Sequence, residues 1–215
     1  MEISRTGKFK VPYFGGLPYL SGDKIVRLWL KAQGNKLLHP RYKELVAAID
    51  NEEALEKMLK VFNVDEHGYP VIPTHQLFEC SRNAARLAGI WYKYKVSNEG
   101  WSTSILLEPI NCSLTNGKLI KAPDGVDVRT VTTKVNRKTV SFFTAYQYIN
   151  AGATFDMKLS FPEDLVTKVT KVKNADTIYE PDQEKSQECA NMVLDKMGSV
   201  GLGAFRSRYG KFAWV

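Results

Sequence analysis

The sequence predicts an α+β fold, in which helices pack against a largely antiparallel sheet. Apolar residues recur at helical spacing over residues 74–87 and again over 183–197. Between them, residues 90–161 carry strand-type patterns, rich in β-branched and aromatic residues and interrupted by turn dipeptides such as Asn116–Gly117. Helices that are separated in sequence from a run of antiparallel strands are typical of the α+β class.

The composition is that of one soluble, positively charged domain. The chain has 215 residues, of which 44% are hydrophobic and 25% charged, enough to bury a core without disulfide bonds. Its formal net charge of +7 favours a polyanionic partner. Cys80, Cys112 and Cys189 are widely spaced, which indicates buried thiols in a reducing compartment. With no signal-peptide pattern and no long apolar run, the sequence predicts a cytoplasmic protein without a membrane partner.

The N-terminal third predicts one strand followed by helices. Residues 2–11 are strand-like, and residues 12–18 form a loop rich in glycine and proline. Helices are predicted from the cap at Ser21 or Asp23 to about residue 32, and over Pro40–Ile49 and Glu52–Phe62. We interpret residues 21–62 as a helical insertion in a single domain that spans residues 1–215.

The middle of the chain predicts one helix and then strands. Thr74 can cap a helix that runs to about Leu87, and Gly89 ends it. The strands that follow are predicted at Trp91–Val96, Ser104–Leu107, Val126–Thr133, Thr139–Ile149 and Ala153–Phe161. Residues 115–140 are interpreted as an inserted β-hairpin.

The C-terminal part predicts a helix, a glycine-rich loop and a final strand. Residues 162–180 show no clear pattern. Asp182 caps a helix over Gln183–Met197, Gly198 ends that helix, and Phe205–Trp214 is predicted to be mainly extended and paired in the sheet. The order of elements favours a ferredoxin-like or RRM-like antiparallel sheet.

The glycine-rich C-terminal segment is the first candidate binding site. Glycine lets backbone amides converge on an anion, and arginine side chains suit phosphate oxygens. The alternative interpretation is a glycine helix stop followed by a strand whose aromatic residues belong to the core. The candidate phosphate ligands are Gly201, Gly203, Arg206, Arg208 and Lys211.

A second basic cluster lies at the tip of the predicted hairpin. Its candidate binding residues are Arg129, Lys134, Arg137 and Lys138, with no acidic residue among residues 129–138. A solvated loop is the alternative interpretation. Tyrosine pairs at strand spacing could stack on bases or pack under a helix, and they are Tyr92 with Tyr94 and Tyr146 with Tyr148.

Common catalytic and metal-binding motifs are absent from the sequence, so we expect no cofactor and no metal site. His39, His67 and His75 fit surface or capping positions better than a catalytic centre. If the protein is an enzyme, His75 or His39 is the candidate general base.

Two segments resemble a known family. Residues 70–82, with the sequence PVIPTHQLFECSR, resemble the IPGSSLKGALR-like segment of the RAMP superfamily, the RRM-like subunits of CRISPR effector complexes. Residues 201–212, GLGAFRSRYGKF, resemble the glycine-rich loop of that superfamily and the GLGDWRPRYGRFEV-type ends of uncharacterised phage proteins. His75 and Gln76 stand where the superfamily has small residues, which favours a diverged, phage-type relative.

This resemblance implies an RRM-like fold that binds single-stranded nucleic acid, often as a side-by-side oligomer. The sequence thus predicts a non-catalytic protein that binds single-stranded RNA or DNA through the phosphate backbone. A metal-independent endoribonuclease of RAMP type is one alternative. A phage interaction protein that imitates or blocks an effector subunit is another.

Overall fold

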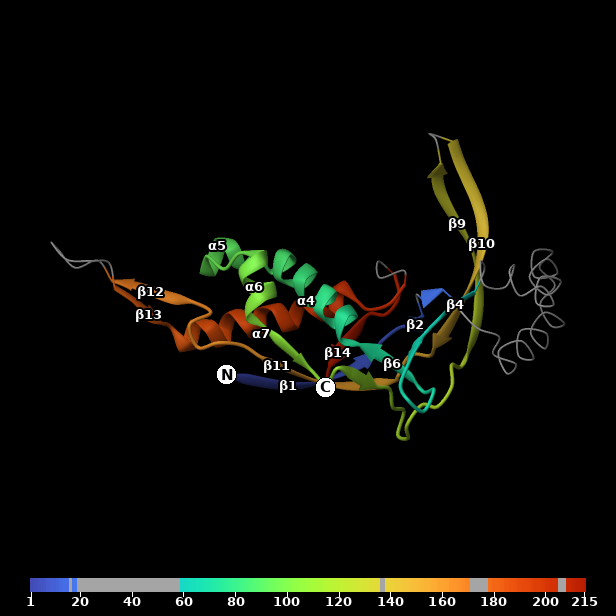
Figure 1. The fold of residues 1–215 in the computed structure, drawn as a ribbon, viewed down its shortest axis with the longest axis horizontal. Coiled ribbons are helices and arrows are strands. Elements are labelled where there is room, and N and C mark those ends of the chain that lie inside the picture. Colours follow the sequence, from blue (N-terminus) through green and yellow to red (C-terminus); the bar gives the residue numbers. More distant parts are fainter. Residues whose placement is uncertain (16, 19–58, 136–137, 171–177, 205–207) are drawn as a thin grey trace.

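The computed structural model describes residues 1–15, 17–18, 59–135, 138–170, 178–204 and 208–215. Its elements form a ferredoxin-like body, with one long β-hairpin at one end and a short one at the other (Figure 1). The helices predicted between residues 21 and 58 lie outside the described residues, as do Arg206 and Arg137.

The central sheet has four antiparallel strands. They are β1 (Glu2–Phe9), β7 (Leu106–Glu108), β11 (Thr154–Ser160) and β14 (Phe212–Trp214), in the spatial order β14-β1-β11-β7. The helix α4 (Thr74–Ala88) connects the first pair in sequence, and α7 (Gln183–Val200) connects the second. This βαββαβ path is the ferredoxin-like arrangement, so the predicted fold class is confirmed.

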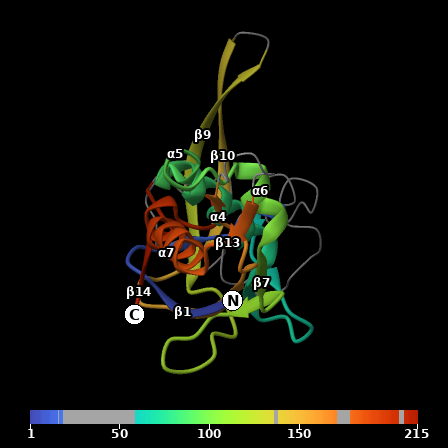
Figure 2. The same ribbon diagram turned by 90° about the vertical axis from the view of Figure 1, so that its left-hand side faces the viewer.

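The core lies between this sheet and the two helices, which cover one face of it (Figure 2). Alternate residues of β11 point to the helices, and Phe155, Met157 and Leu159 are buried. Helices α4 and α7 pack against each other, and the Cys80 thiol lies 3.4 Å from the Met197 carbonyl oxygen. Cys112 and Cys189 are also buried, as predicted, and burial raises the pKa of each thiol to about 12.

A second sheet carries the long hairpin. Strands β9 (Gly125–Val135) and β10 (Lys138–Ile149) form the predicted hairpin, which projects beyond the helices (Figures 1 and 2). At its base, β10 also pairs with β2 (Tyr13–Phe14) and with β4 (Leu59–Val61). Strand β3 (Leu17–Pro18) pairs with β4.

The remaining strands form two small sheets. Strands β5 (Asn63–Val64), β6 (Pro70–Pro73) and β8 (Asn111–Ser113) make one of them. Strands β12 (Thr167–Thr170) and β13 (Ile178–Pro181) make a hairpin at the end of the molecule opposite β9–β10 (Figure 1), within the segment that showed no clear pattern.

The strand predicted at Trp91–Val96 is wrong. Residues Ile90–Tyr94 form the helix α5, and Asn98–Ser104 form α6, so Ser104 ends a helix and the strand begins only at Leu106. Ile90 and Tyr94 are both buried, four residues apart, which anchors one face of a helical turn. The alternation at Trp91–Val96 is only six residues long, and packing decided the structure instead.

Two helix ends also differ from the prediction. Residues 59–61, expected in the helix Glu52–Phe62, form the strand β4, because β10 supplies hydrogen-bonding partners for them. Helix α7 continues past Gly198 to Val200, and Gly201 caps it. A Cβ at residue 198 would lie 2.2 Å from the Phe212 carbonyl oxygen, so Gly198 allows α7 to approach β14 rather than ending the helix.

The C-terminal strand is shorter than predicted. Of the described residues 208–214 in the predicted range Phe205–Trp214, only Phe212–Trp214 form a strand, and residues 208–210 form a turn. The strand pairs with β1 at the edge of the central sheet, as the order of elements led us to expect. No helix in the described part of the chain is long and apolar enough to span a bilayer.

Candidate nucleic-acid interface

The glycine-rich segment folds back on the N-terminal part of the chain. The Leu202 amide donates to the Gly210 carbonyl at 3.0 Å and so closes the loop. The Ala204 amide donates to the Phe14 carbonyl at 3.1 Å, and the Gly210 amide donates to the Pro12 carbonyl at 2.9 Å. The loop Gly201–Gly210 is therefore fixed at both ends to the segment that contains β2.

Glycine is required here by close approach as well as by backbone conformation. Gly203 has a φ of 72°, and a Cβ there would lie 2.3 Å from the Phe14 carbonyl oxygen. Gly210 has a φ of 65°, and a Cβ there would lie 1.9 Å from the Leu202 carbonyl oxygen. The Gly201 amide donates to the Met197 carbonyl at 3.0 Å, so it serves the end of α7.

Aromatic rings connect this loop to the base of the long hairpin. The Tyr209 ring meets the Phe14 ring edge to face, with the centroids 4.9 Å apart. Phe14 in turn lies 5.8 Å from the Tyr148 ring and pairs with Tyr148 through the backbone. Residues 13–14, 148, 201–204 and 208–210 thus pack together, although they are far apart in the sequence.

The basic residues predicted for binding lie on the two elements that meet here. Arg208 is exposed, and within the described residues it forms no ion pair or hydrogen bond. In the hairpin register, Arg129 lies opposite Thr144 near the base, and Lys134 lies opposite Thr139 near the tip. Lys138, the first residue of β10, lies opposite Val135.

Lys211 has a structural partner that the sequence did not reveal. Its ammonium group donates to the carbonyl oxygens of Ser199 and Val200, in the last turn of α7. Burial lowers the pKa of Lys211. A cation at the carbonyl end of a helix satisfies the last carbonyl groups and complements the helix dipole. Lys211 follows the Gly201 cap by ten residues, so no local pattern in the sequence indicated this contact.

We expect Lys211→Met to act mainly on stability. The apolar side chain leaves two carbonyl groups of α7 without their donor, which should lower the free energy of unfolding by about 1 kcal/mol. The slope of log affinity against log salt for single-stranded nucleic acid should stay unchanged. Chemical denaturation and fluorescence anisotropy check the two quantities, and a slope reduced by about 0.7 would instead make Lys211 a phosphate ligand.

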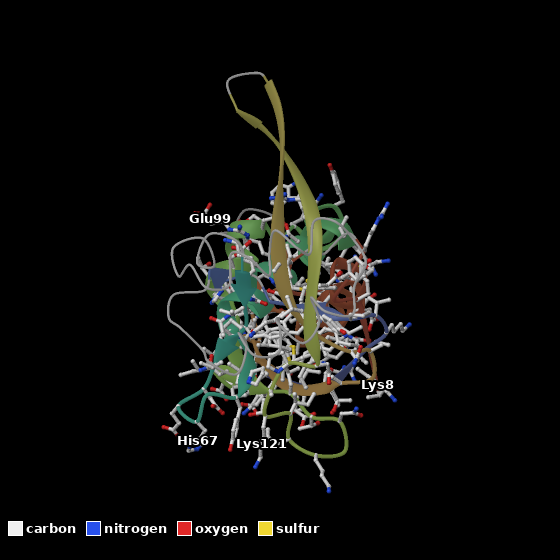
Figure 3. All side chains as sticks on the ribbon, turned by 90° about the vertical axis from the view of Figure 1, so that its right-hand side faces the viewer. Lys8, His67, Glu99 and Lys121 are labelled. Atoms are coloured by element: carbon white, nitrogen blue, oxygen red, sulfur yellow. The ribbon has the colours of Figure 1, made fainter. Side chains whose placement is uncertain are left out.

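The N-terminal end of α4 reaches the same loop. The Tyr13 hydroxyl donates to Gln76 Oε1 at 2.8 Å, and the Tyr13 ring packs closely against Gly203. His75, next to Gln76, is exposed in the first turn of α4. His67 lies on an exposed turn at the end of the molecule remote from the hairpin tip (Figure 3). His39 lies outside the described residues.

The open face of the central sheet has a different character. The rings of Phe9, Phe155 and Phe212 point to the helices and are buried. A cleft of 720 Å³ on the open side is lined by residues that include Glu108, Asp156 and Lys158. The strand residues that point away from the helices are Glu2, Ser4, Thr6, Lys8, Leu106, Glu108, Thr154, Asp156, Lys158, Ser160 and Ala213.

This face therefore offers no aromatic ring on which a base could stack. The cleft is lined by two carboxylates and two cations, so it offers a polyanion no excess of positive charge. The described residues contain no cluster of histidine, cysteine and acidic side chains able to hold a metal ion. The surface made by the glycine-rich loop and the long hairpin, which are joined through the buried strand β2 and which we name the loop–hairpin surface, is the stronger candidate for a polyanion.

The chain was compared with protein families, curated proteins and solved structures, and only solved structures are similar to it. No family model matches the chain, and no curated protein matches its sequence. The chain is similar to Cmr6 from Pyrococcus furiosus, with 8% identity and a TM-score of 0.44, over 100% of this chain and 98% of that one. It is also similar to a chain of the Csm–crRNA–target RNA ternary complex of a type III-A CRISPR–Cas system, with 14% identity and a TM-score of 0.32, over 76% and 65% of the two chains.

Proposed function

We propose that this protein binds single-stranded RNA or DNA at the loop–hairpin surface, without cleaving it. One observation carries the proposal: Phe14 connects the glycine-rich loop, which carries Arg208, to the base of the long hairpin, which carries the second basic segment. Phe14 pairs with Tyr148 of the hairpin and accepts the hydrogen bond of Ala204 in the loop. A net charge of +7 supports a polyanionic partner for this surface.

The chemistry of the binding follows from the side chains that the two elements carry. Arg206 and Arg208 would hold phosphate oxygens through their guanidinium groups. Arg129, Lys134, Arg137 and Lys138 would clamp the strand from the hairpin. Gly201 and Gly203 contribute by allowing the loop to lie against α7 and β2, which holds the arginine-bearing segment in place.

We further propose that the chain is a diverged member of the RAMP superfamily. The βαββαβ order and the glycine-rich loop after α7 support this proposal. A single domain over residues 1–215 with insertions at about 21–62 and 115–140, a phage origin, a side-by-side oligomer and a role in blocking an effector complex remain predictions.

The binding proposal is tested with labelled single strands. Anisotropy of fluorescein-labelled oligouridine and oligothymidine should show saturable binding to the purified protein that weakens as salt rises. A duplex of the same length serves as the comparison, and the preference for the single strand is expected to persist at each salt concentration. Absence of binding to both single strands at low salt would overturn the proposal.

The position of His75 favours a second candidate function, a metal-independent endoribonuclease. His75 lies next to Gln76, which accepts a hydrogen bond from Tyr13, and the Tyr13 ring lies against Gly203 of the glycine-rich loop. Proton transfer by a positioned histidine needs no metal ion and persists in EDTA.

We expect no cleavage of labelled RNA by the wild-type protein in EDTA, and nearly unchanged affinity for His75→Ala. Denaturing electrophoresis of the RNA and anisotropy provide the two measurements. His67→Ala is the matched control, because His67 is equally exposed but remote from the loop–hairpin surface. Cleavage that disappears in His75→Ala and persists in His67→Ala would establish the enzyme in place of the binder.

A further inference from the structure

Helix α5 exposes two adjacent aromatic side chains, Trp91 and Tyr92. Ile90 is 1% exposed and Tyr94 is 6% exposed, so the helix is anchored through these two residues. An ion pair of 2.5 Å between Lys93 and Glu188 also ties it to α7. Because the anchored residues occupy the inner face, Trp91 and Tyr92 point outward and are 53% and 83% exposed.

These rings border a pocket of 380 Å³. It lies between the end of α4, the helix α5 and the start of α6, and its lining residues are Ala85, Arg86, Trp91, Tyr92, Ser97 and Asn98. The lining residues provide two aromatic rings, the guanidinium group of Arg86 and the carboxamide of Asn98, and none of them is acidic. Aromatic faces stack on bases, and amide groups offer both a donor and an acceptor to a base edge.

The backbone around this pocket is unusual. Gly89, with a φ of 65°, ends α4 and begins α5, which turns the chain sharply at the pocket. Lys95 has a φ of 61°, a conformation that costs a lysine free energy, and its amide donates to the Trp91 carbonyl. This left-handed lysine closes α5 and leads the chain to Ser97 and Asn98 on the other side of the pocket.

The charges near the pocket favour an anionic ligand. Arg86 and Lys95 are exposed, and within the described residues neither forms an ion pair. By contrast, Arg82 is paired with Glu79 at 2.9 Å, so one cation nearby is already balanced. An apolar protein partner would gain from the two rings but would have to cover the unpaired guanidinium group of Arg86.

One stripe of α4 leads from the loop–hairpin surface to this pocket. Positions 75, 79, 82 and 86 share a face of the helix, since they follow one another at intervals of four, three and four residues. His75 lies at the end near the glycine-rich loop, and Arg86 lines the pocket about 16 Å further along the axis. In Figures 1 and 2, α5 and the long hairpin lie on the same side of the central sheet.

We propose that the pocket at Trp91 and Tyr92 is a base-stacking subsite for a single-stranded nucleic acid that also contacts the loop–hairpin surface. This inference rests on the proposed function. One base stacks on the exposed rings, Asn98 contacts its edge, and Arg86 holds the adjoining phosphate. The bound strand runs along the outer stripe of α4.

The test compares Trp91→Ala/Tyr92→Ala with the wild type on fluorescein-labelled oligouridine of about 16 nucleotides, the upper end of common single-strand site sizes. Affinity should fall about tenfold, as expected for the loss of one stacked base, while the salt slope stays unchanged because no phosphate ligand is removed. Both side chains are exposed, so the melting temperature should be retained. Leu87→Ala is the matched control, because Leu87 is a 65% exposed apolar residue near the end of α4 and does not line the pocket.

Trp91→Phe gives a second readout that does not depend on the double variant. Phenylalanine keeps a ring for stacking, so the affinity of Trp91→Phe should stay near that of the wild type. In a Trp29→Phe background, used because Trp29 lies outside the described residues, quenching of tryptophan fluorescence on binding should be lost, since Trp101 is fully buried and the Trp214 indole donates to the Leu194 carbonyl.

The outcomes separate this inference from the proposed function. If the wild type binds and the double variant binds equally well with the quench retained in Trp91→Phe, the stacking subsite is overturned and the proposed function stands. If the double variant binds equally well but changes its sedimentation coefficient, the surface is a protein interface, which also overturns the inference. If the wild type does not bind oligouridine or oligothymidine at low salt, both are overturned.

Discussion

Replacing Arg206 and Arg208 together with alanine is expected to weaken single-strand binding about a hundredfold or more at low salt. Each substitution would remove a charge-assisted hydrogen bond worth about 1.5–3 kcal/mol. Each lost phosphate contact also reduces the slope of log affinity against log salt by about 0.7, so the slope should fall by about 1.4. Different sequences should be affected about equally, since phosphate contacts position a strand without reading it.

Salt-dependent anisotropy and the melting temperature, measured on the same preparation, test this expectation. Lys121→Ala is the control, because it removes an exposed cation at the end of the molecule remote from the hairpin tip (Figure 3). Its affinity should change little. A double variant that melts earlier while its salt slope matches the wild type would mean that the arginines stabilise the fold and do not bind phosphate.

Gly210→Ala is expected to have the largest effect on stability. Its Cβ would lie 1.9 Å from the Leu202 carbonyl oxygen, and its φ of 65° is unfavourable for alanine. The loop must open to relieve the contact, which breaks the hydrogen bonds that Gly210 makes to Leu202 and Pro12. We expect the free energy of unfolding to fall by about 3 kcal/mol and the melting temperature by about 6–12 °C. Single-strand affinity should fall as well, because the loop carries Arg208.

Gly117→Ala separates the close approach from the backbone conformation. Gly117 has a φ of 70°, similar to that of Gly210, but a Cβ there would meet no atom within 4 Å. The free energy of unfolding of Gly117→Ala should fall by only about 1 kcal/mol, which is the cost of placing alanine in the left-handed conformation. Equal losses for the two variants in chemical denaturation would show that the contact with Leu202 contributes nothing.

Local patterns were sufficient for the elements whose packing agrees with their sequence. Thr74–Ala88 and the start of α7 are helices because their apolar stripes match the helical period, and the Asp182 side chain accepts from the Lys185 amide at 3.1 Å. The cap expected from Thr74 is wrong, because Pro73 is the N-cap of α4 and the Thr74 hydroxyl donates to the Ile110 carbonyl. The hairpin follows from its β-branched strands, and alternate burial in β11 follows from its period of two. These features require only neighbours in the sequence.

The two basic segments were recognised from the sequence alone. Arg208, predicted to be a phosphate ligand, is exposed in the structure. The sequence did not show that Lys211 caps α7, because the carbonyl groups that it contacts become neighbours only when the loop turns back. The alternating pattern predicted a strand at Trp91–Val96. Residues Ile90–Tyr94 form a helix instead, because Ile90 and Tyr94 are both buried in the folded chain. A short alternating stretch satisfies both periods, and only packing decides between them.

The tertiary structure decided that the glycine-rich loop lies against the base of the long hairpin. Phe14 belongs to a two-residue strand, too short for any periodicity, yet it pairs with Tyr148 and accepts a hydrogen bond from Ala204. The close contacts of Gly203 and Gly210 are equally invisible in the sequence, where glycine indicates only permitted backbone angles. Composition and spacing determine which residues are present and which element each prefers. The distances between elements depend on hydrogen bonds and packing that form only when the whole chain is folded.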